Sequence, residues 1–135
     1  MQNYIYLITP FIAWLICGLT KFAINCLKER RLAFDLIGYG GMPSNHSAIV
    51  SSMASLIAFK EGINSPAFGV ALTLAFIVML DANSLRKQIG EHAVAINQLD
   101  NYQTINLRER IGHTKLEICM GVLLGTCIGY TLGSA

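Results

Sequence analysis

Apolar residues are gathered into four runs along the chain, and short polar stretches separate them. The first run, at about 4–27, is long enough to cross a bilayer at about 1.5 Å of rise per helical residue. The other three runs, at about 45–59, 66–80 and 116–133, fall below the roughly 20 residues of a comfortable span. They predict membrane helices that tilt little, thin the bilayer or are covered by another subunit.

The polar stretch 83–115 carries apolar residues at helical spacing, with charged residues on the other faces. This pattern predicts an amphipathic helix that lies at the membrane surface, followed by a loop at 101–107. The apolar positions are Leu85, Ile89, Ala93, Ile96 and Leu99. The predicted fold is therefore all-α: a small polytopic membrane helix bundle of about four membrane helices plus one amphipathic surface helix, in a single domain over 1–135.

Composition supports a membrane location. Hydrophobic residues make up 53% of the 135 residues and charged residues only 13%, about half the charged share of a soluble domain. Disorder, nucleic-acid binding and a secreted disulfide scaffold fit this composition poorly, and the net charge of +2 is too small to argue for a polyanionic partner. The four cysteines lie inside apolar runs without a CxxC pair, as small buried hydrophobes do. We expect an integral protein of a bacterial-type inner membrane, in contact with membrane lipids and with no nucleic-acid partner.

Positive charge is distributed unequally between the two sides of the predicted bundle. The side that holds both long polar stretches carries Lys28, Arg30, Arg31, Arg86, Lys87, Arg108, Arg110 and Lys115. The opposite side offers only Lys60. Because basic loops stay in the cytoplasm, the pattern predicts cytoplasmic polar stretches and two external termini.

Small residues recur every four positions on two of the predicted helices. The two sets are Gly121, Gly125, Gly129 and Gly133 on the last helix and Ser47, Ser51 and Ser55 on the second. Such ridges let helix backbones approach closely in lipid. The sequence leaves open whether each ridge packs within the chain or against a second copy. Together with the short spans, the ridges favour a homodimer or higher homo-oligomer.

Ionisable and polar residues from four segments converge on the cytoplasmic ends of the predicted helices. They are Lys21 in the first run, the segment 40–47 before the second, Asp81 at the end of the third, and the segment 112–117 before the fourth. Ionisable groups at membrane depth are costly, so a functional site is the default hypothesis for such a cluster.

The residue types favour phosphate as the ligand. Helix N-termini after Pro43 and after Gly112 offer free N–H groups and a positive dipole end. Gly40 and Gly41 permit close approach of the backbone to a ligand. Fixed positive charge is available from Lys21, Lys28, Arg31 and Arg108.

Two histidines, His46 and His113, offer a nucleophile and a general acid that work near neutral pH. Glu117 lies one helical turn after His113 on the same face, where its carboxylate can fix the tautomer of that imidazole. Asp81 is equally compatible with a catalytic role or with an ion pair to Lys21 or Arg86. No cluster has metal-ligand spacing, so the expected chemistry uses no metal and no cofactor.

These residues resemble motifs of the divergent branch of the type 2 phosphatidic acid phosphatase family, whose superfamily includes vanadium haloperoxidases. The resemblance covers about 21–129 and rests on Gly-Gly-Met-Pro-Ser-Asn-His-Ser, on Asp81 with Arg86, and on Leu-Arg-Glu-Arg-Ile-Gly-His-Thr-Lys-Leu-Glu. Within them, segment 43–46 matches the family's Pro-Ser-x-His motif. Segment 113–117 matches its His-x-x-x-Asp motif with Glu in place of Asp.

The resemblance implies roles for individual residues. His113 would be the nucleophile that forms a phosphohistidine, and His46 would protonate the leaving oxygen. Ser44 and nearby backbone N–H groups would hold phosphate oxygens, with basic help from the first and third motifs. Beyond these roles, we expect Gly41, Asp81 and Arg86 to support the site.

The chain departs from the family pattern at three places. The family's first motif has an arginine seven residues after its lysine, whereas seven after Lys21 comes Lys28, with Arg31 as a substitute. Arg108 lies five residues before His113 rather than six. The family is usually six-spanning, and this chain offers four apolar runs.

The leading expectation is a membrane-embedded phosphatase for a lipid-linked phosphate or diphosphate. The alternative is a non-catalytic protein that binds or transports lipid phosphate or another anion through the same pocket. Simpler roles exist for the histidines as well: His46 could merely follow a helix cap formed by Ser44 or Asn45, and His113 could contact lipid head groups.

Overall fold

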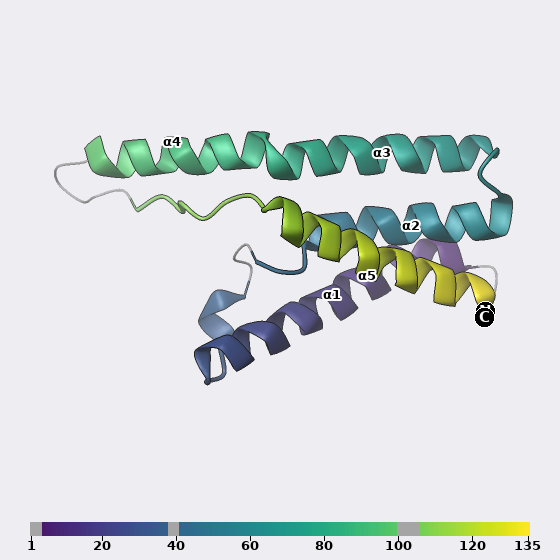
Figure 1. Cartoon of the computed structure of the whole chain (residues 1–135), viewed down its shortest axis with the longest axis horizontal. Coiled ribbons are helices and arrows are strands. Elements are labelled where there is room, and N and C mark those ends of the chain that lie inside the picture. The colour runs from purple at the N-terminus through teal and green to yellow at the C-terminus, as the bar shows by residue number, and fades with distance from the viewer. Residues whose placement is uncertain (1–3, 38–40, 100–105) are drawn as a thin grey trace.

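The computed structural model describes residues 4–37, 41–99 and 106–135. Within these ranges every regular element is a helix, as the sequence predicts. The elements are α1 (Ile5–Glu29), the 3-10 helix η2 (Phe34–Leu36), α2 (Asn45–Glu61), α3 (Pro66–Asn83), α4 (Leu85–Leu99) and α5 (Lys115–Ser134), shown in Figure 1. Gly40 and most of the predicted loop at 101–107 lie outside the described residues.

Hydroxyl side chains set the starts of three helices. The Ser44 hydroxyl accepts a hydrogen bond from the Ser47 amide at the start of α2, and the Ser65 hydroxyl accepts one at the start of α3. Thr114 begins α5 with a capping box, in which its hydroxyl and the Glu117 carboxylate each accept from the other residue's backbone N–H. Each cap satisfies amides that have no partner within the helix, which explains why these helices begin where they do.

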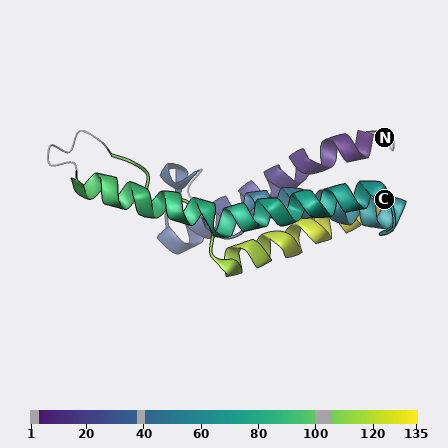
Figure 2. The same ribbon diagram turned by 90° about the horizontal axis from the view of Figure 1, so that it is seen from above.

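The second helix, α2, lies at the centre of the bundle, where it packs against α1, α3 and α5. Both ends of the chain lie at the same end of the bundle (Figure 2). The Tyr6 hydroxyl donates to Glu61 Oε1 at 2.6 Å and ties the start of α1 to the end of α2 there. The segments that were predicted to carry chemistry lie toward the opposite end.

The glycine ridge of α5 packs against α2 of the same chain. A Cβ added at Gly121 would lie 2.5 Å from the Ser44 carbonyl oxygen, and one at Gly125 or Gly129 would overlap the α2 backbone. The Ser55 hydroxyl also donates to the Thr126 carbonyl at 3.0 Å across this contact. The ridge therefore serves the fold of one chain and no longer argues for a homo-oligomer, so self-association stays a prediction.

Three helices are long and apolar enough to cross a membrane: α1, the continuous stretch Pro66–Leu99, and α5. The fourth predicted span, α2, has only 17 residues, and its serine-rich faces are buried among the other helices. Large apolar side chains such as Phe11, Val70 and Leu123 point outward from the longer helices. The chain is thus an all-helical membrane bundle in which the serine-rich helix is the inner one.

The amphipathic helix predicted within 83–115 is present as α4, but its direction differs from the prediction. In both views α4 continues almost in line with α3 and extends beyond the bundle (Figures 1 and 2). Hydrogen bonds of helical spacing cross the junction, because the Ser84 amide donates to Leu80 and the Gln88 amide to Ser84. The stretch Pro66–Leu99 therefore has no sharp bend that would turn α4 into the plane of a membrane crossed by α3.

Candidate functional site

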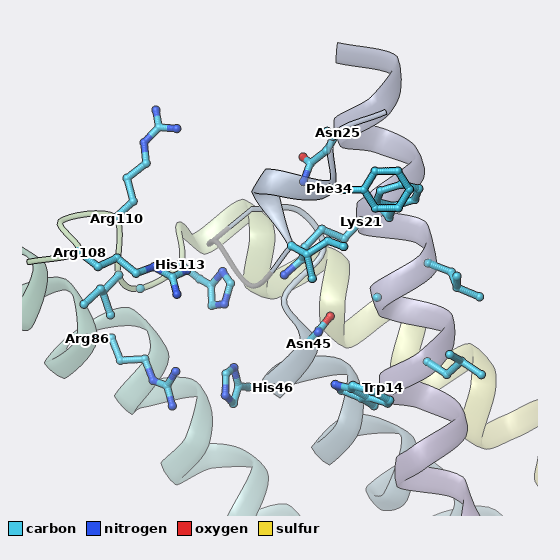
Figure 3. Close-up of a pocket in the computed structure, with 18 residues that line it drawn as sticks. Trp14, Lys21, Asn25, Phe34, Asn45, His46, Arg86, Arg108, Arg110 and His113 are labelled. Atoms are coloured by element: carbon cyan, nitrogen blue, oxygen red, sulfur yellow. The ribbon is translucent and has the colours of Figure 1, made fainter. Parts of the chain in front are cut away.

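A cavity of about 650 Å³ lies between α1, the segment 33–37, the start of α2, the α3–α4 junction and the segment 108–113. Its apolar wall comes mainly from α1 and η2, including Trp14, Phe22 and Phe34. Its polar wall carries two histidines and four cationic residues, most of which are labelled in Figure 3. The polar lining residues with a charge or an imidazole are Lys21, His46, Arg86, Arg108, Arg110 and His113.

His46 and His113 lie near each other on the polar wall, with ring centroids 6.3 Å apart. His46 is in the first turn of α2, directly after the Ser44 cap. His113 precedes α5, and its backbone amide donates to the Ala82 carbonyl of α3 at 3.1 Å. The starts of α2 and α5 and the end of α3 therefore bring together two imidazoles that lie far apart in the sequence, at positions 46 and 113.

Glu117 holds the His113 ring as the i,i+4 spacing predicts. Its Oε2 lies 3.3 Å from His113 Nδ1, and the same oxygen accepts from the Thr114 amide at 2.9 Å. The Glu117 carbonyl accepts from the Ser44 amide at 3.0 Å, which joins the first turn of α5 to the start of α2. With Nδ1 directed at a carboxylate, Nε2 is the nitrogen of His113 that is available for chemistry.

Burial lowers the pKa of His113 below its ordinary value, since only 7% of the side chain is exposed. The positive charge of Lys21 lowers this pKa further, and the hydrogen bond to Glu117 opposes the change. The lowered pKa favours the neutral imidazole, the state in which it can act as a nucleophile.

Lys21 projects from α1 into the cavity and is 9% exposed. Among the described residues its ammonium group has no hydrogen-bond or ion-pair partner. An ammonium group that faces the cavity can receive an anion there.

Arg108 reaches the cavity although it is one residue closer to His113 than the family pattern expects. The chain from 106 to 114 is not helical, so the offset does not turn the side chain away as it would on a helix. Figure 3 shows Arg108 beside His113, whereas Arg110 points away from both histidines.

Lys28, Arg31, Ser44 and Gly41, four residues predicted to contact or support phosphate, do not line the cavity. Lys28 is exposed in the last turn of α1. Arg31 is exposed and forms a two-point ion pair with Asp35, at 2.8 and 2.9 Å, which lowers the pKa of the Asp35 carboxyl. Ser44 is fully buried as the α2 cap, and Gly41 adopts a φ of 143° in the segment before it.

Asp81 forms an ion pair with Arg86, whose Nε donates to Asp81 Oδ2 at 2.9 Å. Of the alternatives open from the sequence, the structure therefore selects this pairing over one with Lys21. Within the described residues no group of three or more His, Cys, Asp or Glu side chains is arranged to hold a metal ion.

Asn45 was not among the residues predicted to form the site, yet it lines the cavity between Lys21 and Trp14. Its Oδ1 is buried and has no hydrogen-bond partner within the part of the chain that the structure describes. The variable position of the Pro-Ser-x-His segment is thus part of the wall. Its place beside His46 in the first turn of a capped helix was the available signal, although neighbouring helical residues do not have to face the same space.

The fold and the cavity define a class: a helical membrane protein with two histidines and several cations around one cavity. Comparison with known proteins agrees. Residues 1–128 match the divergent PAP2 family, and the chain belongs to that family. It is also similar to the uncharacterized membrane protein YuiD of Bacillus subtilis strain 168, with 30% identity over 145 aligned positions that cover 93% of this chain and 92% of that protein. No solved structure matches the chain.

Proposed function

We propose that this protein is a membrane-embedded phosphatase that hydrolyses a lipid-linked phosphate or diphosphate through a phosphohistidine intermediate. The observation that carries the proposal is the pair of histidines at 6.3 Å, one of which has its Nδ1 held by Glu117. A held, neutral imidazole opposite a second imidazole supplies a nucleophile and an acid without any metal.

In the proposed reaction, Nε2 of His113 attacks phosphorus while the bond from phosphorus to the lipid oxygen breaks. His46 gives its proton to the departing oxygen, so the lipid leaves as an alcohol or, from a diphosphate, as a monophosphate. His46 then takes a proton from a water molecule that attacks the phosphohistidine. This second step releases inorganic phosphate and restores both rings.

The cations of the polar wall would offset the charge on the phosphoryl oxygens. Lys21 lines the cavity and has no ion-pair partner among the described residues, and Arg108 lies beside His113 (Figure 3). Charge stabilisation by fixed groups in a water-poor cavity contributes strongly to phosphoryl transfer. The apolar wall of Trp14, Phe22 and Phe34 suits the lipid portion of the substrate.

The proposal places the cavity on the cytoplasmic side and both termini outside, since the basic segments lie at the cavity end. Single cysteines introduced at 62–65 and at 106–110 test this orientation with a membrane-impermeant thiol reagent. The turn at 62–65 should react from outside and 106–110 only after the membrane is opened. The reverse pattern would contradict the orientation.

The function itself is tested by phosphate release from a panel of lipid phosphates and diphosphates, with detergent-purified protein and no added metal. We expect turnover that vanadate inhibits, because vanadate mimics the five-coordinate phosphoryl group. His113→Ala should abolish turnover. If the wild type releases no phosphate from any substrate yet binds lipid phosphate, the protein is the non-catalytic binder instead.

A further inference from the structure

The cavity holds an arginine whose guanidinium group is only partly engaged by protein. Arg86 is the second residue of α4, just past the end of α3, and Figure 3 shows its guanidinium beside His46. Its Nε–H donates to Asp81, and none of its four Nη–H groups has a partner among the described residues. Arg31 offers a contrast, because both of its Nη atoms are bound by Asp35.

We propose that Arg86 binds the phosphate of the substrate through its Nη atoms and that Asp81 is the residue that positions it. This inference rests on the proposed function, because it assigns a contact within the same site. Two Nη–H donors in one plane match the oxygens of a phosphate group. Lys28 and Arg31, two of the four cations that the sequence offered for this role, lie outside the cavity.

Asp81 is suited to hold the arginine without blocking it. A carboxylate bound at Nε alone fixes the plane of the guanidinium and leaves its outer edge open. Both side chains are about one third exposed, at 35% and 34%. A pair that is neither fully buried nor fully solvated retains its charge and can still meet an incoming ligand.

The backbone around Arg86 is tied to the segment that carries His113. The amide of His113 donates to Ala82, and Gly112 packs directly on the α3–α4 junction with a φ of 102°. A Cβ at Gly112 would lie 3.0 Å from the Lys87 amide nitrogen and 3.3 Å from the Arg86 carbonyl carbon. These contacts fix the arginine relative to the proposed nucleophile, as recognition of one phosphoryl group requires.

The experiment compares Arg86→Ala, Arg86→Lys and Asp81→Asn with Lys87→Ala as the matched control. Lys87 is the exposed neighbour of Arg86 and does not line the cavity. The readouts are KM for a lipid phosphate and the affinity for inorganic phosphate, measured by titration calorimetry in detergent. Losing a hydrogen bond to a charged group should weaken phosphate binding about 10- to 100-fold in Arg86→Ala.

Arg86→Lys keeps the charge and should recover part of that loss, whereas Lys87→Ala should bind like the wild type. Asp81→Asn should weaken binding less than Arg86→Ala does, and it should have no further effect in the Arg86→Ala background. A purely structural Asp81 would weaken binding equally in both backgrounds. That result would overturn its positioning role.

Two outcomes separate this inference from the proposed function. Loss of phosphate binding in Arg86→Ala, in a protein that hydrolyses nothing, supports the inference and rejects the phosphatase. Turnover with an unchanged KM and unchanged phosphate affinity in a folded Arg86→Ala protein rejects the inference and leaves the phosphatase standing. Absence of phosphate binding by the wild type also overturns the assignment of Arg86.

Discussion

The α2–α5 interface and the adjoining cavity are built from opposite kinds of residue. In the interface, glycines of α5 meet serine and alanine backbone of α2 so closely that a single added methyl group would overlap it. In the cavity, long cationic and aromatic side chains surround a space of about 650 Å³. The two regions meet at Ser44, which contacts Gly121 on one side and precedes Asn45 and His46 on the other.

The difference shows how a short chain can hold a charged cavity in lipid. Lipid gives helices no hydrophobic drive to associate, so close backbone packing supplies the attraction. The interface fixes the starts of α2 and α5, and these starts carry His46 and Glu117. Neighbouring but separate residues therefore determine stability and chemistry. Substitutions in the interface should affect stability, and substitutions in the cavity should affect chemistry.

The largest expected effect is on chemistry alone. His113→Ala should lower phosphate release by about 10⁴-fold or more, because no neighbour can replace the nucleophile. The melting temperature in detergent should change little, since the ring is not part of the helix interface. His92→Ala is the matched control, as His92 is exposed on α4 and does not line the cavity. Equal turnover in the two variants would reject the covalent route.

His46→Ala should have the next largest effect, and its size should depend on the substrate. General acid catalysis contributes about 10²–10⁴-fold, and a lipid alcohol needs the proton most. With an activated aryl phosphate, whose leaving group needs little protonation, the loss should shrink by about tenfold or more. An identical loss on both substrates would mean that His46 does not act on the leaving oxygen.

Local rules were enough to predict much of the fold and part of the site. A hydroxyl cap at Ser44 lies where the second apolar run begins. The His113–Glu117 contact forms between the predicted residues, although His113 lies just before the N-cap of α5 rather than within the helix. The four-residue period of the glycines predicted a close helix contact, although one sequence cannot tell an internal partner from a second copy.

Other features depend on packing between distant segments and were missed for that reason. Lys28 has the position but not the residue type of the family's first motif, and Arg31 was expected as its substitute. Arg31 instead forms an ion pair with Asp35, four residues further along the chain. The role of α2 as the inner helix arises only when three others surround it. Continuous helical hydrogen bonding at Ser84 determined the direction of α4, which hydrophobic periodicity does not report.

A smaller effect is expected on stability, from a substitution in the α2–α5 interface. Gly125→Ala places a methyl group against the Ala48 backbone, and such overpacking costs about 1–3 kcal/mol. Gly69→Ala is the control, because a Cβ there meets nothing within 4 Å and removes only the helix penalty of glycine. Thermal unfolding in detergent should show a lower midpoint for Gly125→Ala only. Equal midpoints would mean that the ridge contributes nothing to stability.

The smallest effect concerns pH, and its sign follows from the surroundings of His113. Burial and Lys21 lower the pKa of His113, so the nucleophile loses its proton below the ordinary histidine value of about 6.5. Activity should therefore persist to lower pH than an unperturbed histidine allows, and it should fall as the imidazole becomes protonated.

Glu117 opposes this shift by raising the pKa of His113. Glu117→Gln should thus move the acidic limb of kcat/KM further toward low pH while it lowers the plateau, because the correct tautomer is less well held. Titration of the substrate is common to both proteins, so the displacement between the two profiles reports the enzyme. A limb that moves toward higher pH, or does not move, would show that Glu117 does not act on the nucleophile.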